Sequence, residues 1–193
     1  MNLTRKSFVL APSLVLAYGA VHIFDGLDGT YGPGLAWTAG HLAFLAALAL
    51  FVPLVLDLAR RARNPRMAGA VAALSLLGIA AGAAQFAIDL VVGFLAADRT
   101  EMGKLFDLVQ EVPGAMPVIY TIVPTFFYIG LVILVSMEAA AGRIGWWSPT
   151  LVALGVVVVV ISRDLLVLSA LLNLAGLAPL SREHTRARPL QKT

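Results

Sequence analysis

The chain of 193 residues contains no cysteine, which excludes disulfide bonds, thiolate metal sites and cysteine nucleophiles. Charged residues are also scarce. They make up 13% of the sequence, against 60% hydrophobic residues, and the mean hydropathy is +0.89. A water-soluble protein of this size could not cover so much apolar surface with so few polar side chains. The composition therefore predicts an integral membrane protein.

Apolar runs long enough to cross a bilayer recur along the chain, since one crossing needs about 20 such residues. We expect an all-α fold, a polytopic membrane helix bundle with five transmembrane helices, formed as a single domain by residues 1–180. The first run follows Arg5 and Lys6 as a signal peptide would, but no small-residue cleavage pattern comes after it, so we interpret it as a retained helix. The expected spans are residues 7–24, 35–58, 68–97, 116–138 and 149–177.

Residues 98–114 leave the apolar pattern. Met102 and Phe106 fall on one face of a helix there, while Glu101 and Asp107 fall on another. This arrangement is typical of an amphipathic helix that lies in the membrane interface. We therefore expect one interfacial helix in addition to the five spans.

The net charge of +3 and the pI near 9.6 come mostly from arginines at the ends of apolar segments. Such charges orient a membrane protein and interact with lipid headgroups, so we expect the lipid bilayer, and not nucleic acid, as the partner. Four arginines lie in residues 59–67. With the expected spans, they fall on the same side of the membrane as Arg5, Lys6 and Arg143. The pattern predicts a multi-pass protein of the cell membrane with a cytoplasmic N-terminus.

The C-terminal residues 181–193 are polar and basic, and we expect them to be disordered. Five spans place this tail outside the cell, against the positive-inside rule. Either the tail is a tolerated exception or the run 148–180 does not cross the membrane once. Because a hairpin in that run would lack a turn signal, we expect a single span.

The third span carries two polar side chains, Gln85 and Asp89, one helical turn apart. A carboxylate inside a bilayer is costly and is expected to face other helices or a cavity. Small residues allow helices to approach closely, so this face is expected to pack against neighbouring helices. It also carries Ser75, Gly78, Gly82 and Gly93.

Further polar side chains fall at a similar depth on the other spans. Arg163 and Asp164 lie near the middle of the predicted fifth span. An Asp89–Arg163 ion pair that only joins two helices is one interpretation. The other is a chamber in the outer half of the bundle, with residues 98–114 as its roof.

A dry chamber that holds a protonated carboxylic acid and aromatic rings suits a proton-initiated carbocation reaction. We expect Asp89 or Asp164 to be the catalytic acid. The substrate would be an apolar or prenylated small molecule. The residues expected to bind it are Gln85, Phe86, Arg163, Trp37, His41 and Tyr128.

In its size, its multi-pass topology and its intramembrane carboxylates Asp89 and Asp164, the chain resembles the small multi-pass membrane terpene cyclases. The resemblance implies cyclisation of a prenylated or epoxidised substrate, as in meroterpenoid formation, without a metal or other cofactor. Asp89 or Asp164 would be the acid. The sequence has no DDxxD-type aspartate cluster, which argues against a magnesium-dependent prenyltransferase.

Three other classes remain open. His22 and His41 are expected at one depth on adjacent helices, where they could bind haem or a metal with Asp25 as a hydrogen-bonding partner. Pro53 and Pro124 break helices as in transporters, but the chain has no internal repeat. A non-catalytic membrane or assembly protein needs no site at all.

Overall fold

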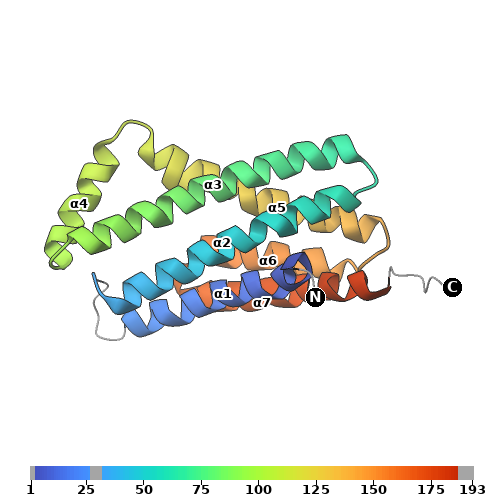
Figure 1. Cartoon of the computed structure of the whole chain (residues 1–193), viewed down its shortest axis with the longest axis horizontal. Coiled ribbons are helices and arrows are strands. Elements are labelled where there is room, and N and C mark those ends of the chain that lie inside the picture. The colour runs from blue at the N-terminus through green and yellow to red at the C-terminus, as the bar shows by residue number, and fades with distance from the viewer. Residues whose placement is uncertain (1–2, 27–31, 187–193) are drawn as a thin grey trace.

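The long apolar runs form the long helices of an all-α bundle. The structure is a computed structural model that describes residues 3–26 and 32–186 (Figure 1). Four of its helical segments are long and apolar enough to cross a membrane, so the chain is a multi-pass helical membrane protein. The described elements are α1 (Leu3–Asp25), α2 (Leu35–Arg61), α3 (Pro65–Leu95), α4 (Arg99–Glu111), the π-helix η1 (Met116–Thr121), α5 (Ile122–Ala140), α6 (Trp147–Ile161), the 3₁₀ helix η2 (Arg163–Leu165) and α7 (Leu166–Arg186).

Where the single span 149–177 was expected, the structure has a hairpin, which corrects that prediction. Helix α6 ends at Ile161, its C-cap residue Ser162 has an extended backbone (φ −153°, ψ 133°), and α7 returns alongside α6. The Ser162 Oγ accepts a hydrogen bond from the Asp164 N–H at 3.2 Å. Side chains of this kind compete with the helical backbone bonds and stop the helix. The turn signal was therefore the polar sequence Ser162–Asp164.

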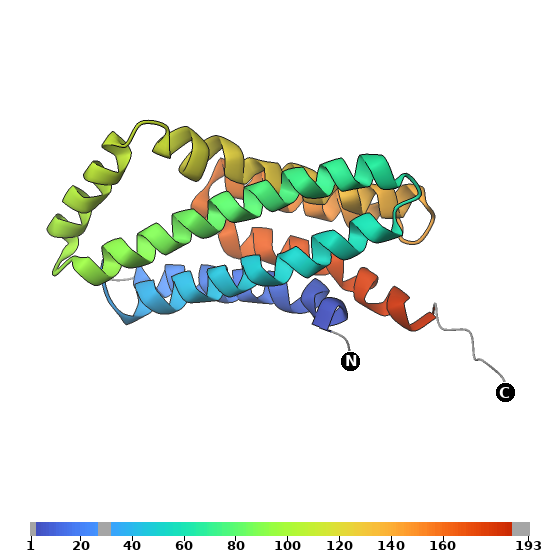
Figure 2. The same cartoon turned by 45° about the horizontal axis from the view of Figure 1, so that its top comes forward.

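The hairpin is tightly packed and shorter than its neighbours. A Cβ atom at Gly155 would lie 2.5 Å from Nδ2 of Asn173, and one at Gly176 would lie 2.8 Å from the Ser148 carbonyl oxygen. Helix α6 has 15 residues, about 22 Å at 1.5 Å per residue. Its turn accordingly lies short of the far ends of α2 and α3 (Figure 2).

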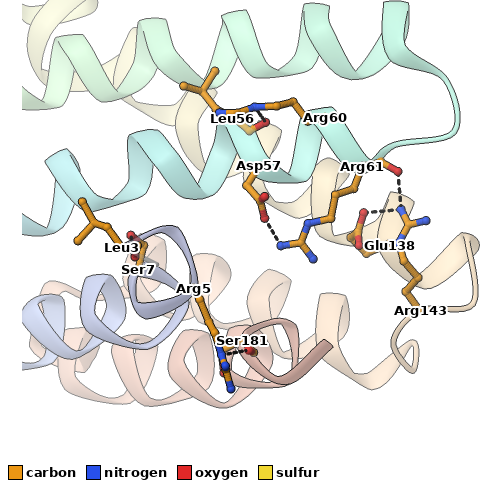
Figure 3. Close-up of polar contacts among 10 residues, drawn as sticks. All are labelled: Leu3, Arg5, Ser7, Leu56, Asp57, Arg60, Arg61, Glu138, Arg143 and Ser181. Atoms are coloured by element: carbon orange, nitrogen blue, oxygen red, sulfur yellow. Dashed lines mark hydrogen bonds and ion pairs between the residues drawn. The ribbon is translucent and has the colours of Figure 1, made fainter. Parts of the chain in front are cut away.

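The start of α1 and the end of α7 lie at one end of the bundle, together with the α2–α3 and α5–α6 turns (Figures 1 and 2). We call this the arginine-rich end. Arg5 Nε donates to the Ser181 carbonyl at 2.8 Å, which joins the start of α1 to α7 (Figure 3). Because α6 leaves this end and α7 returns to it, Ser181 lies at the same end as Arg5. Residues 181–186 are helical, contrary to the predicted disorder, and 187–193 lie outside the described residues.

The small-residue face of α3 packs against neighbouring helices, as predicted. A Cβ atom at Gly78 would clash with the backbone nitrogen of Phe127 on α5. At Gly93 it would lie 2.5 Å from Nε1 of Trp37 on α2. These contacts bring α2 and α5 close to α3 on the side that carries Asp89.

Helix α4 is amphipathic, as expected, but it does not cover a chamber. Asp98 caps it by accepting from the Glu101 N–H at 2.9 Å. The helix leaves α3 at an angle (Figures 1 and 2) and packs through Met102 against Val92 and Ala96. An apolar notch of about 450 Å³ separates α4 from the end of α3.

Candidate functional site

Asp89 lies at the centre of a polar cluster that joins three elements. It is only 7% exposed. Tyr120 on η1 donates its hydroxyl to Asp89 Oδ1 at 2.9 Å, and His41 on α2 places Nε2 3.7 Å from Oδ2. Trp37 donates its indole N–H to the Asp89 carbonyl at 3.0 Å. The carboxylate therefore faces into the bundle, as the sequence predicted.

The hydrogen bonds of His41 define which edge of its ring meets Asp89. His41 is 4% exposed, and its Nδ1 lies 2.7 Å from the Trp37 carbonyl oxygen. A carbonyl oxygen only accepts, so Nδ1 carries a hydrogen and donates it. Nε2 then faces Asp89 Oδ2, 3.7 Å away.

The π-helix η1 explains how Tyr120 reaches Asp89. Pro124 has no N–H, and its ring excludes the normal helical position of the Tyr120 carbonyl four residues earlier. The Ile122 N–H instead bonds to the Pro117 carbonyl, five residues back. Such widened turns occur often at functional sites. Tyr120 was absent from the predicted site, although Pro124, four residues downstream, marks the distortion.

Aromatic rings enclose His41. The ring centroids of Trp37 and Phe86 lie 4.0 and 5.1 Å from that of His41, and Tyr18 meets it edge-on at 5.8 Å. Phe44 stacks on Phe86 at 4.0 Å. This packing covers the faces of the imidazole ring and holds it in place.

A cleft of about 430 Å³ lies beside the cluster, between α3, α5 and the end of α6. Tyr120 and Phe86 belong both to the cleft wall and to the surroundings of Asp89 and His41. The cleft is lined by Tyr18, Phe44, Leu48, Gly78, Gly82, Gln85, Phe86, Tyr120, Thr121, Pro124, Thr125, Phe127, Tyr128, Val159, Val160, Ile161, Ser162 and Leu166.

Two polar side chains of the cleft make no hydrogen bond to the described part of the chain. Within residues 3–26 and 32–186, neither the Gln85 amide nor the Tyr128 hydroxyl makes a hydrogen bond, and both side chains line the cleft. Burying a polar group without a hydrogen bond costs free energy. A bound molecule with a polar group would remove that cost by forming hydrogen bonds to Gln85 and Tyr128.

The mouth of the cleft lies between η1 and the α6–α7 turn. Thr121 and Thr125 on one rim and Val160 and Ile161 on the other are exposed. Val160 and Ile161 are 76% and 72% exposed, so this rim of the cleft is open on the outer surface of the bundle.

Asp164 does not join Asp89. It is exposed in η2, where the Ser162 hydroxyl lies 3.3 Å from its Oδ2. Ser162 and Leu166 on either side of it line the cleft, so the turn borders the mouth. The side chain of Arg163 lies outside the described residues, and so does the predicted Asp89–Arg163 pair. The partners that the structure gives Asp89 are Tyr120 and His41.

Trp37 and His41 support the site without lining the cleft. They border a separate crevice of about 10 Å³ with His22 and Asp25, which has room for about one water molecule and none for haem. Both ring nitrogens of His41 already face partners. Within the described ranges, no three histidine, aspartate or glutamate side chains are grouped to hold a metal ion.

No protein-family model matches the chain, and no curated protein or solved structure is detectably similar to it. The function is therefore inferred from the geometry of Asp89, Tyr120 and the cleft.

Proposed function

We propose that this multi-pass membrane protein is an enzyme for a lipid-like substrate, in which Asp89 and Tyr120 together act as the acid. One observation carries the proposal. The Tyr120 hydroxyl bonds to the buried Asp89 carboxylate, while the same side chain lines the cleft. Tyr120 is therefore the group through which a proton can pass from Asp89 to a bound molecule.

The proposed proton transfer uses the 2.9 Å contact in both directions. With Asp89 ionised, Tyr120 donates to it. With Asp89 protonated, the carboxyl group donates to the phenol oxygen and frees the Tyr120 proton for the cleft. His41 faces the other carboxylate oxygen at 3.7 Å. Trp37 and His41 act as positioning residues in this scheme.

The cleft suits a molecule that is mostly apolar and carries a polar group. Phe86 and Phe127 offer aromatic faces that stabilise cationic carbon. Gln85 and Tyr128 offer unpaired hydrogen-bonding groups for a hydroxyl or carbonyl. A sideways mouth at Val160 and Ile161 would admit such a molecule directly from the bilayer.

The specific reaction that we propose is a metal-independent cyclisation of an epoxidised, prenylated compound. A proton from Tyr120 adds to the epoxide oxygen as the Asp89 proton moves to Tyr120. One carbon–oxygen bond then breaks with its electrons remaining on oxygen, and the π electrons of a nearby double bond attack the cationic carbon. The last cation returns a proton to the Asp89–Tyr120 pair. Substrate and product are isomers, so the step needs no co-reactant.

The proposal gives Asp164 a different role from Asp89. Asp164 belongs to the turn that borders the cleft mouth, and Arg163 shares that turn by its backbone position. We assign Asp164 to contact with the polar end of an entering substrate. This assignment leaves Asp89 as the acid.

We also propose that the arginine-rich end faces the cytoplasm. Arg60, Arg63 and Arg143 lie at that end with the start of α1 and the end of α7, whereas Arg99 and Lys104 lie on α4 at the other. Positive charge prefers the cytoplasmic side of a membrane. The cleft mouth then lies in the outer half of the bilayer.

The test is turnover of an epoxidised farnesyl phenol by the purified protein in lipid nanodiscs, followed by mass spectrometry and chromatography. Asp89→Asn and Tyr120→Phe are expected to lower the rate at least about 100-fold, the usual contribution of general acid catalysis. Asp107→Asn on the exposed face of α4 is the matched control and should keep full activity. Full activity in both site variants would contradict the proposal, and so would no turnover by the unmodified protein.

A non-catalytic role is the second candidate, because Trp37, His41, Asp89 and Tyr120 also bond to one another across α2, α3 and η1. In that case Asp89→Asn should change the thermal stability in detergent, and the unmodified protein should catalyse no reaction that the variant could lose. The enzyme proposal instead expects Asp89→Asn to remain folded, because an amide oxygen still accepts from Tyr120.

A further inference from the structure

A second cavity, which we call the inner cavity, lies beside the cleft. It measures about 40 Å³ and extends between α1, α5, α6 and α7. Its polar lining residues are Ser169 and Asn173 on α7 and Tyr128 on α5. The cleft and this inner cavity share five lining side chains: Phe44, Phe127, Tyr128, Val159 and Leu166.

The shared side chains make the inner cavity a continuation of the cleft. Only the thickness of these side chains separates the two spaces. Tyr120 lines the cleft alone, whereas Tyr128 lines both. The two residues are eight positions apart, about 12 Å along a helix. The combined space is therefore elongated, with the Asp89–Tyr120 pair beside one part and the inner cavity at the end.

The walls of the inner cavity favour an apolar occupant. Pro12, Val15 and Leu131 contribute only apolar surface. Asn173 uses one of its two amide N–H groups within α7, donating from Nδ2 to the Ser169 carbonyl at 2.8 Å. A water molecule needs about 10–15 Å³ of such space, so the inner cavity has room for a branched group of a few carbon atoms.

We propose that the inner cavity receives the apolar end of the substrate chain and thereby sets the longest chain that the protein accepts. This inference depends on the proposed function, because it names the substrate class of the same site. The substrate is a prenyl chain with a polar group near Tyr120 and Gln85, and its last branched unit lies between Tyr128 and Ser169. Ser169 is a specificity-determining residue because its side chain is small and 5% exposed, at the cavity wall.

The experiment measures the Kd of prenyl phenols with one to four isoprene units for the protein in lipid nanodiscs. For the unmodified protein, affinity should rise with each unit until the inner cavity is filled. Ser169→Phe fills the cavity and is expected to weaken binding of the longest accepted phenol at least about tenfold, since a buried branched unit is lost. Binding of the one-unit phenol should stay within about twofold.

Two further variants keep the test decisive. Leu171→Phe lies on the same helix, is 46% exposed at the outer surface, and should leave the whole length series unchanged. Leu166→Ala removes side-chain volume from the wall that the cleft and the inner cavity share, which enlarges the space for the substrate chain. It should extend the accepted length by one isoprene unit, which tests the inference even if Ser169→Phe does not fold.

The outcomes separate this inference from the proposed function. If short and long phenols bind but neither Ser169→Phe nor Leu166→Ala changes the length dependence, the inner cavity is not part of the site and the inference is wrong. If no phenol of any length binds the unmodified protein, both the proposed function and the inference fail.

Discussion

Arg143 forms a bidentate ion pair with Glu138, whose side chain is fully buried at the arginine-rich end (Figure 3). Nε of Arg143 donates to Oε2 at 2.8 Å and Nη2 donates to Oε1 at 2.6 Å. Nη2 also donates to the Arg61 carbonyl at 3.0 Å, at the end of α2. In return, Arg63 donates to the Ala141 carbonyl at 3.2 Å, just after α5. Each of the α2–α3 and α5–α6 turns therefore donates a hydrogen bond to a backbone carbonyl at the helix end beside the other turn.

We predict that Arg143→Met destabilises the protein by roughly 3 kcal/mol, because it leaves the Glu138 carboxylate buried without a partner. The measurement is unfolding in mixed detergent micelles. Arg60→Met is the matched control, since the Nε of Arg60 bonds to Leu56 within its own helix at an exposed position. Equal stability of the two variants would contradict the structural role of the pair. Adding Glu138→Gln to Arg143→Met should recover part of the loss.

A second prediction concerns the close contact of α3 with α5. Gly78→Ala places a methyl group against the Phe127 backbone, which cannot move without separating the helices. Overpacking of this kind costs about 1–3 kcal/mol. Gly69→Ala, at the start of the same helix, has nothing within 4 Å of the added atom and should be neutral or slightly stabilising. Thermal unfolding in detergent distinguishes the two, and similar melting temperatures would show that α3 and α5 are farther apart.

A third prediction concerns topology, and the absence of cysteine makes it simple to test. Single cysteines at Arg66→Cys and Thr193→Cys should be labelled from the same side of sealed membranes by an impermeant maleimide. Lys104→Cys on α4 should be labelled from the other side. The reason is that α6 and α7 form a hairpin that returns to the arginine-rich end. Labelling of Thr193→Cys from the same side as Lys104→Cys would contradict the hairpin and support a single span over residues 149–177.

Part of the fold follows from local pattern alone. The apolar runs predicted the helices α1, α2, α3 and α5, because a backbone in lipid must satisfy its own hydrogen bonds. Gly78 and Gly93 indicated the face of α3 that meets other helices, and Asp89 had to lie on that face because a carboxylate cannot face lipid cheaply. The orientation of Asp89 was thus predictable without knowledge of its partners.

The partners themselves were decided by the tertiary structure. Tyr120 lies 31 residues from Asp89 in sequence, and it reaches the carboxylate only because Pro124 widens the helix at η1 and α5 packs against α3. The helix break at Ser162 also could not be predicted from hydropathy, because it depends on which hydrogen bond the Asp164 N–H makes. A serine hydroxyl takes the place of a helical hydrogen bond, and the close packing of Gly155 and Gly176 then stabilises the returning helix.

Residue order was enough to predict a membrane helix bundle with an inward carboxylate, because burial of apolar and charged groups is a local requirement. The packing of the helices was needed to show that Tyr120 and His41 meet that carboxylate, that Asp164 does not, and that α7 returns to the arginine-rich end. Those outcomes depend on which distant side chains fit together, and that fit is a property of the packed helices.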